Sequence, residues 1–266
     1  MADPAVIVEA DGPVLTVTLN RPEKRNAVNS EVMCRLYDAW VQLDTDDDLR
    51  VAILTGKGTT FCAGMDLSEI GKLGGPPENE WMERVQSDPA IIFGAWLKTY
   101  RPTKPVILAA EGFARAGGTE ILQGTDIRIA GEGAIFGVWE AKRGLFPMAG
   151  SAVRLRRQIG YAVAAEMLIC GDDLPAERAY QLGLINRVVP DGEALATARE
   201  IADRIARNGP LAVKAIVATL RETEMLSEAD AFVIEQQHGM GVMTSADAAE
   251  GPRAFLEKRD PVFQGR

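Results

Sequence analysis

Two glutamates, Glu120 and Glu140, are the side chains of this sequence best suited to acid–base chemistry. Each one ends a short glycine-bearing segment, at residues 116–120 and 136–140 respectively. Two carboxyl groups at one site can share a proton, one acting as a base and the other as an acid. Taken singly, Glu120 is as readily a helix-capping acid and Glu140 a surface ion-pair partner of the basic residues after it. The pair alone would also suit a glycosidase.

Backbone donors for an oxyanion are predicted at two places. Gly117 and Gly118 stand where a helix is expected to begin, so a ligand can approach their backbone and meet unpaired N–H groups. The loop Ala63-Gly64-Met65 would supply a second donor. Two such donors suit a thioester oxygen as an enolate develops, each contributing roughly 3–4 kcal/mol. A Gly-Gly pair before a helix is, by itself, more often only a tight turn.

Composition excludes several classes of protein. The 266 residues carry a formal net charge of −9, which argues against a basic face for nucleic acid. The single histidine, His238, rules out a multi-histidine metal site, and the three widely spaced cysteines lack a zinc pattern. No phosphate-loop motif, GxGxxG fingerprint or GxSxG elbow is present. We therefore expect no metal site.

Length and hydropathy indicate a soluble protein. No apolar stretch approaches the roughly 18–20 residues of a membrane span, and we do not expect Met1 to Pro4 to begin a signal peptide. Unpaired cysteines fit a reducing compartment. We expect a cytoplasmic protein with no membrane or nucleic-acid partner.

Strands and helices are expected to alternate through the first three quarters of the chain, which indicates a layered α/β core. Residues 5–9 and 14–19 form a predicted hairpin, and Ser30 is expected to cap the first helix. The other expected elements of this part are buried strands at 51–54, 106–110 and 127–130 and a short helix at 119–123. Residues 69–101 show no clear strand.

The last part of the chain is expected to be helical. Four helical stretches are predicted there, at residues 194–207, 211–221, 229–239 and 246–258. The expected division is a catalytic core at 1–195 and a C-terminal helical region at 196–266.

Several segments together resemble the crotonase superfamily, the enoyl-CoA hydratase/isomerase family. The segments are Asn20 to Ala27, Phe61 to Leu67, Glu111 to Glu120 and Ala254 to Arg259, in the family's order. The resemblance runs from about residue 5 to residue 263. It implies a spiral of ββα repeats with a C-terminal helical trimerisation region, assembled as a homotrimer or a dimer of trimers.

The resemblance also implies roles for individual residues. Glu120 and Glu140 match both catalytic glutamates of the hydratases, and the N–H groups of Met65 and Gly117 match the oxyanion hole. The Met148 N–H group would help to place the catalytic water. The residues implied in coenzyme A binding are Lys24, Arg25, Ala27, Ala63, Gly64, Met65, Asp66, Leu67, Phe255 and Lys258. Coenzyme A is part of the substrate, so no separate cofactor is implied.

Four positions depart from the family's usual residues, namely Ala116, Thr119, Trp139 and Met148. The acyl pocket has no clear pattern. The apolar residues that could line it, or could equally be ordinary core, are Trp81, Met82, Ile91, Ile92, Phe93, Trp96 and Trp139. A bulky acyl group, branched or steroid, is compatible with them.

The implied activity is hydration of a trans-2-enoyl-CoA. Isomerases of the family typically keep one of the two acids, so retention of both favours hydration. The alternatives on the same scaffold are an enoyl-CoA isomerase and a hydroxyacyl-CoA dehydratase of the carnitinyl-CoA type. A non-catalytic or RNA-binding member is disfavoured by the acidic charge.

Overall fold

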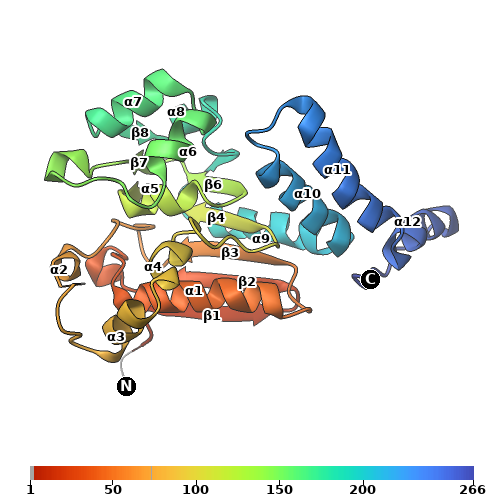
Figure 1. Ribbon diagram of the computed structural model, residues 1–266, viewed down its shortest axis with the longest axis horizontal. Coiled ribbons are helices and arrows are strands. Elements are labelled where there is room, and N and C mark those ends of the chain that lie inside the picture. Colours follow the sequence, from red (N-terminus) through yellow and green to blue (C-terminus); the bar gives the residue numbers. More distant parts are fainter. Residues whose placement is uncertain (1–2, 73) are drawn as a thin grey trace.

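A parallel-rich sheet forms the centre of the computed structural model, which describes residues 3–72 and 74–266 (Figure 1). β1 pairs antiparallel with β2, and the remaining pairings of this sheet are parallel. Its strands, in spatial order, are β1 (Val6–Asp11), β2 (Val14–Leu19), β3 (Val51–Gly56), β4 (Val106–Ala110), β6 (Ile127–Gly131) and β9 (Arg187–Val189). The predicted hairpin and the three predicted buried strands are confirmed. Met1 and Ala2, which belong to the signal-peptide prediction, lie outside the described residues.

Helices cover both faces of this sheet, which explains why its strands read as nearly continuous apolar runs. Neighbouring residues of β2 point to opposite faces. Leu15 packs in the core beneath α1 (Ser30–Thr45), whereas Val14 packs beneath α9 (Ala194–Ala206). Because α9 covers the sheet, the helices that leave the body begin only after it. The division near residue 195 stays a prediction.

The N-cap of the first helix lies one residue before the predicted one. Asn29, and not Ser30, is the N-cap, because the Asn29 carboxamide oxygen accepts a hydrogen bond from the Val32 N–H group at 3.0 Å. Ser30 is the first helical residue and is buried. Its N–H group bonds the Glu69 carboxylate at 2.8 Å.

A smaller sheet of three strands carries the segments predicted to be functional. β5 (Phe113–Arg115) pairs parallel with β7 (Ile135–Gly137), and β7 pairs antiparallel with β8 (Asp173–Pro175). The short helix α5 (Gly117–Leu122) follows β5 directly and begins two residues before its predicted start. Two single-turn 3-10 helices, η1 (Pro22–Lys24) and η2 (Ala141–Arg143), lie in the loops near the site.

The segment from residue 69 to residue 101, in which no strand was expected, is largely helical. It holds the end of α2 (Leu67–Ile70), then α3 (Glu80–Ser87) and α4 (Ala90–Ala95). Asn79 caps α3 by accepting a hydrogen bond from the Met82 N–H group at 2.9 Å. The remaining helices of the body are α6 (Ser151–Gln158), α7 (Tyr161–Ile169) and α8 (Ala176–Gln181).

The C-terminal helices extend away from the body, as Figure 1 shows in blue. They are α10 (Pro210–Glu222), α11 (Glu228–Met243) and α12 (Ala246–Glu257). Proline suits the first position of α10 because the first N–H groups of a helix have no partner within it. Within the described residues, no helix combines the length and apolarity needed to cross a membrane.

Candidate active site

Glu120 and Glu140 line one cavity of about 660 Å³. The cavity lies between α5, the loop after β7 and the loops around α2 and α4. Apolar side chains make up most of its wall, and several of them are well exposed at its rim, including Leu67 and Phe146. A concave apolar site with a few converging polar groups is typical of a small-molecule pocket.

Backbone N–H groups hold the Glu120 carboxyl group in place. Glu120 lies in α5 and is 4% exposed. Its Oε1 accepts a hydrogen bond from the Ser151 N–H group at 3.1 Å, and the N–H groups of Ala149 and Gly150 also point to the carboxylate. Burial raises the pKa of Glu120, and these donors oppose the rise because they favour the charged form.

The Glu140 carboxyl group has fewer hydrogen-bond donors around it among the described residues. Glu140 is half-buried, directly after Trp139, and its Oε2 is buried without a hydrogen-bond partner among the described residues. Burial, followed by the nearby charge of Glu120, raises the pKa of Glu140 to about 7. A surface ion pair with the following basic residues is therefore not the role of this side chain.

The two glutamates form a coupled pair that can hold one proton near neutral pH. Their charges interact, and backbone N–H groups oppose the rise of the pKa at both: those of residues 149–151 at Glu120, and those of Trp139 and Glu140 itself at Glu140. The pKa of Glu140 is raised far enough for the shared proton to be favoured on that group. Such a pair can remove a proton from one atom and deliver a proton to another.

The loop before Met65 runs beside β5. The Cys62 N–H group donates to the Phe113 carbonyl at 3.0 Å, and the Arg115 N–H group donates to the Cys62 carbonyl at 2.9 Å. This pairing brings Met65 and Gly117 to the same cavity. In the described part of the chain, neither the Met65 nor the Gly117 N–H group donates to a protein acceptor. Two free donors beside two carboxyl groups can stabilise an oxyanion.

Glycine is required where these two loops meet. A Cβ on Gly64 would lie 2.7 Å from the Ala116 Cβ and 3.1 Å from the Gly117 nitrogen. A Cβ on Gly117 would lie 2.5 Å from the Trp96 ring. The distances of 2.7 Å and 2.5 Å are shorter than real Cβ contacts, so the close approach of the donors depends on the absence of these side chains.

Ala116 adopts a backbone conformation that favours glycine, with φ +50° and ψ −123°. A non-glycine residue held in such a region costs on the order of 1–3 kcal/mol. We expect Ala116→Gly to raise the free energy of unfolding by about 1 kcal/mol, because relief of strain exceeds the added entropy of the unfolded chain. Urea denaturation measures the change.

A matched control is Ala196→Gly, at an exposed position within α9. This change should lower the free energy of unfolding by about 1 kcal/mol, the ordinary cost of glycine in a helix. Equal losses in both variants would show that Ala116 is unstrained.

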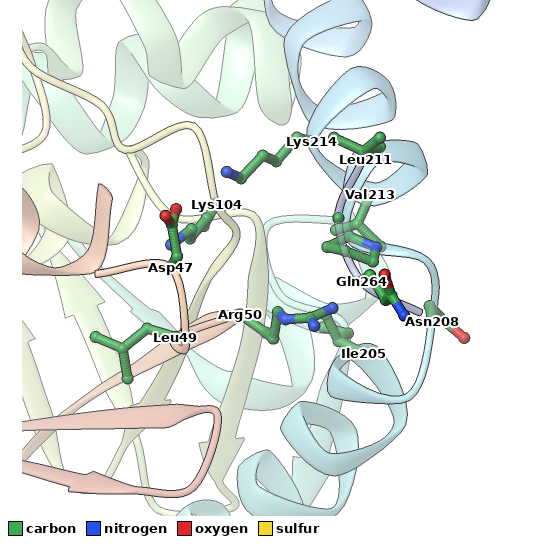
Figure 2. Close-up of a pocket in the computed structure, with 12 residues that line it drawn as sticks. Asp47, Leu49, Arg50, Lys104, Ile205, Asn208, Leu211, Val213, Lys214 and Gln264 are labelled. Carbon is green, nitrogen blue, oxygen red and sulfur yellow. The ribbon is translucent and has the colours of Figure 1, made fainter. Parts of the chain in front are cut away.

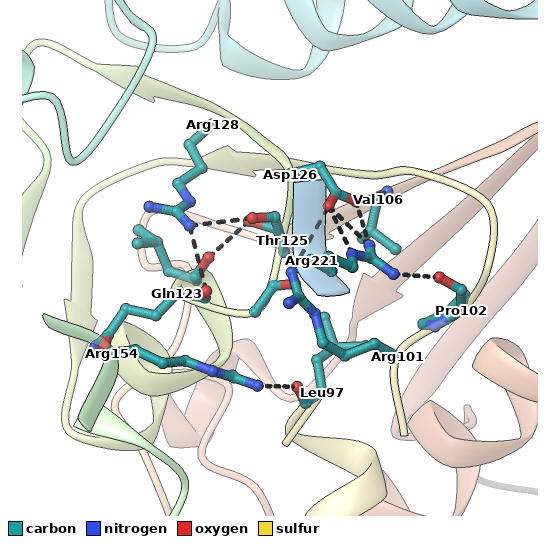
Figure 3. Close-up of polar contacts among 12 residues, drawn as sticks. Leu97, Arg101, Pro102, Val106, Gln123, Thr125, Asp126, Arg128, Arg154 and Arg221 are labelled. Carbon is teal, nitrogen blue, oxygen red and sulfur yellow. Dashed lines mark hydrogen bonds and ion pairs between the residues drawn. The ribbon is translucent and has the colours of Figure 1, made fainter. Parts of the chain in front are cut away.

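Two arginines, the buried Arg128 and the half-buried Arg101, anchor the far end of α5 (Figure 3). Arg128 donates to the carbonyls of Gln123, at 3.3 Å, and Thr125, at 3.0 Å, while Arg101 donates to that of Gly124 at 3.1 Å. These carbonyls follow the last residues of the helix, where cations are favoured. Burial lowers the pKa of Arg128 to about 10, so it remains charged at neutral pH. The cluster holds the helix that carries Glu120.

The predicted acyl-pocket residues divide into two groups. Ile92, Trp96 and Trp139 line the cavity, as does Phe93. Trp81 and Met82 do not lie among its lining residues. The reason is that α3 packs its apolar face on α1, which buries Met82 completely and leaves Trp81 beneath the Arg35 guanidinium at 4.9 Å. Ile91 is likewise core.

The residues implied in coenzyme A binding also divide. Arg25, Ala63, Met65 and Leu67 line the cavity. The implied residues that are not among its lining residues include Lys24, Ala27, Gly64 and Asp66. The Asp66 carboxylate instead caps α2 through the Ser68 N–H group and pairs with Arg21 at 3.0 Å.

Met148 lines the cavity at its exposed rim, and its carbonyl accepts a hydrogen bond from the Lys98 ammonium at 2.5 Å. The role of its N–H group in placing a water stays a prediction. Sequence reasoning missed Thr60, Arg115 and Arg143, which also line the cavity. Arg115 immediately precedes the predicted oxyanion segment, and this position was its only signal in the sequence.

Phe255 and Lys258 lie far from the cavity of their own chain, on or just after α12 at the opposite end of the molecule (Figure 1). Phe255 is 82% exposed. A separate cavity of about 170 Å³ lies between the body and α10 (Figure 2). Arg50, Lys104 and Lys214 line it together with Asp47, and neither glutamate of the pair reaches it.

Comparison with known families and structures agrees with this geometry. The family model described as enoyl-CoA hydratase/isomerase matches residues 9–266. The enoyl-CoA hydratase EchA19 of Mycobacterium tuberculosis is 52% identical over 263 residues, covering 99% of this chain and 97% of the relative. A carnitinyl-CoA dehydratase of Salmonella heidelberg is 37% identical over 261 residues, covering 96% of this chain and 97% of the relative.

A solved structure shares the whole fold. The crystal structure of an enoyl-CoA hydratase from Mycobacterium tuberculosis H37Rv superposes with a TM-score of 0.88 at 40% identity. The superposition covers 99% of this chain and 100% of that one. The expected spiral α/β fold is therefore confirmed.

Proposed function

The chain belongs to the enoyl-CoA hydratase/isomerase family, and we propose that it is an enoyl-CoA hydratase acting reversibly on a trans-2-enoyl-CoA. The observation that carries the proposal is that Glu120 and Glu140 both line one cavity beside two free backbone donors. Proton shuttling within an acyl chain needs one acid–base group, whereas addition of water needs a base for the water and an acid for carbon.

The proposed mechanism uses each group in the state that its surroundings favour. Glu120, as the carboxylate, takes a proton from water as the water oxygen attacks the β-carbon. Glu140, as the acid, delivers a proton to the α-carbon on the same face, which gives syn addition. The N–H groups of Met65 and Gly117 hold the thioester oxygen while it carries enolate charge. The reaction needs no cofactor beyond the coenzyme A of the substrate.

Coenzyme A is proposed to enter along Arg25, Ala63 and Leu67. The acyl group then lies among Ile92, Trp96 and Trp139. A cavity of about 660 Å³ with an apolar wall supports an acyl group larger than crotonyl.

A second candidate is dehydration of a hydroxyacyl-CoA, which is the same chemistry in reverse. The similarity to a carnitinyl-CoA dehydratase supports it. Double-bond isomerisation is the less favoured alternative, since it leaves one of the two glutamates without a role.

The test is turnover of enoyl-CoA esters of graded acyl size, followed by loss of the conjugated thioester absorbance and by product mass. Hydration adds one water to the product, and isomerisation leaves the mass unchanged. Failure to turn over any ester, linear, branched or ring-bearing, would reject the hydratase proposal.

The pH dependence follows from the raised pKa of Glu140. Hydration requires the state with one proton, carried by Glu140, so the rate should fall as pH rises through about 7. It should fall again in acid, as Glu120 becomes protonated. Measurement of kcat/KM across pH checks this bell shape, and a rate that keeps rising above pH 8 would contradict it.

Assembly into a homotrimer or a dimer of trimers is also proposed. Leu220 on α10 and Phe232 and Met240 on α11 are more than half exposed, an apolar surface that suits burial between subunits. Phe255 and Lys258 would then approach a neighbouring cavity. Light scattering of the purified protein measures the mass of this assembly. The proposed location of the protein is the cytoplasm.

A further inference from the structure

One rung of the smaller sheet joins Arg115, Gly137 and Asp173. Arg115 on β5 pairs with Gly137 on β7, and Gly137 pairs in turn with Asp173 on β8. Because the middle residue has no side chain, the outer two meet across it. The Arg115 guanidinium donates to both Asp173 oxygens, with Nη2–Oδ2 at 2.6 Å and Nε–Oδ1 at 3.2 Å. A Cβ on Gly137 would lie 2.6 Å from Asp173 Oδ1.

The indole of Trp139 contacts both members of this ion pair: its edge contacts Asp173 and its face contacts Arg115. Its Nε1–H group donates to Asp173 Oδ1 at 3.0 Å. The Arg115 guanidinium lies 4.0 Å from the centre of the Trp139 ring and 4.0 Å from that of Phe113, so it stacks on both. Arg115, Trp139 and Asp173 are called the clamp below.

The clamp holds the residue that precedes Glu140, and so bears on the position of the Glu140 backbone. Glu140 follows Trp139 directly; its buried Oε2 has no hydrogen-bond partner in the described chain, and the carboxyl group is contacted by the backbone N–H groups of Trp139 and of Glu140 itself. Its position therefore depends on the backbone at either side. On the C-terminal side, the Leu145 N–H group donates to the Glu140 carbonyl at 2.9 Å. On the N-terminal side, the anchored side chain is Trp139.

The same rung is tied to the oxyanion loop. The Ala116 N–H group donates to the Gly137 carbonyl at 2.7 Å. The Gly137 N–H group donates to the Thr119 hydroxyl at 3.0 Å, and that hydroxyl donates to the Ala114 carbonyl. The positions of Glu140 and of the Gly117 N–H group are therefore both fixed relative to Gly137.

We propose that Asp173 is a positioning residue for the reaction: through Trp139 it fixes the Glu140 carboxyl group against the oxyanion hole and keeps it from water. The inference rests on the proposed function of Glu140. Asp173 does not lie among the residues that line the cavity, so it acts through Trp139 and Arg115, which do. A displacement of about 1 Å at a reacting group can cost on the order of 100-fold in rate.

The test compares Asp173→Ala with Trp139→Phe. The first removes the acceptor and the ion pair, and the second removes the indole N–H donor together with the larger ring and leaves the ion pair in place. Each should lower kcat about 10- to 100-fold, and Asp173→Ala should leave KM near the wild-type value. The double variant should be no slower than the slower single variant, because both changes break one contact.

The pH profile separates positioning from general damage. Release of Trp139 admits water to Glu140, and since burial is the main cause of its raised pKa, that pKa should fall. The alkaline limb of kcat/KM should then move to lower pH in both variants. The matched control is Asp172→Ala, whose exposed carboxylate lies 3.9 Å from the Lys142 ammonium, and its kcat and pH profile should be unchanged.

Wild-type rates in both variants would overturn the inference. A lower kcat would also overturn it if the alkaline limb of kcat/KM stays in place and the effects of the two substitutions add in the double variant. Absence of hydration by the wild-type protein would instead reject the proposed function. Thermal melting of each variant confirms that the compared proteins are folded.

Discussion

Glu140→Gln should reduce kcat for hydration by roughly 100- to 10,000-fold with little change in KM. Glutamine keeps the size of the side chain but cannot deliver a proton to the α-carbon. Its carboxamide also does not ionise, whereas burial raises the pKa of Glu140 to about 7, so the alkaline limb of the profile should disappear from the residual activity. Steady-state kinetics across pH measure both effects.

Glu120→Gln should cost a similar factor, because the water would lose its base. The double variant should be little slower than either single variant, since both groups act in one step. The matched control is Glu132→Gln, an exposed glutamate in the turn between β6 and β7, with an expected rate equal to wild type. A full wild-type rate in Glu140→Gln would exclude this carboxyl group as the acid.

Gly64→Ala should reduce kcat roughly 100- to 1,000-fold, the typical cost of an oxyanion donor. Gly64 has φ +94°, and the added methyl group would meet the Ala116 Cβ at 2.7 Å and the Gly117 nitrogen at 3.1 Å. The two loops must separate, which moves the Met65 and Gly117 donors apart. Substrate affinity in the ground state should change less than the rate, because the oxyanion charge develops only in the transition state.

The control for backbone strain is Gly12→Ala, in the hairpin turn between β1 and β2. Gly12 also has positive φ, at +54°, but no atom lies within 4 Å of its added Cβ. Both substitutions carry the left-handed cost of about 1–2 kcal/mol, so both should lower the melting temperature. Only Gly64→Ala should lower kcat. A fast, folded Gly64→Ala variant would show that the donors tolerate separation.

Local sequence patterns anticipated the strands better than the helix boundaries. Apolar runs bounded by glycine and charge located β3, β4 and β6, because a strand buried on both faces leaves a continuous apolar pattern. The cap of α1 was misplaced by one residue, since Asn29 and Ser30 are both good caps and the three-dimensional path chooses between them. Residues 69–101 were unreadable because their helices are short and each buries few residues.

The acyl pocket could not be predicted from residue type. Trp81 and Trp96 are equally apolar in the sequence, yet only Trp96 reaches the cavity. The difference arises because α3 packs on α1, whereas the turn after α4 faces Gly117. Burial against a helix and burial against a ligand require the same side chains, so only the packing distinguishes them.

The sequence by itself determined the chemistry available at Glu120 and Glu140: their types, their glycine-bearing neighbours and the order of the motifs around them. Tertiary structure alone decided how the two carboxyl groups differ. Backbone donors from residues 149–151 stabilise the charge on Glu120, while a buried oxygen of Glu140 has no partner in the described chain. These donors lie about thirty residues from Glu120 along the chain, and a pKa depends on distances in space that no local pattern encodes.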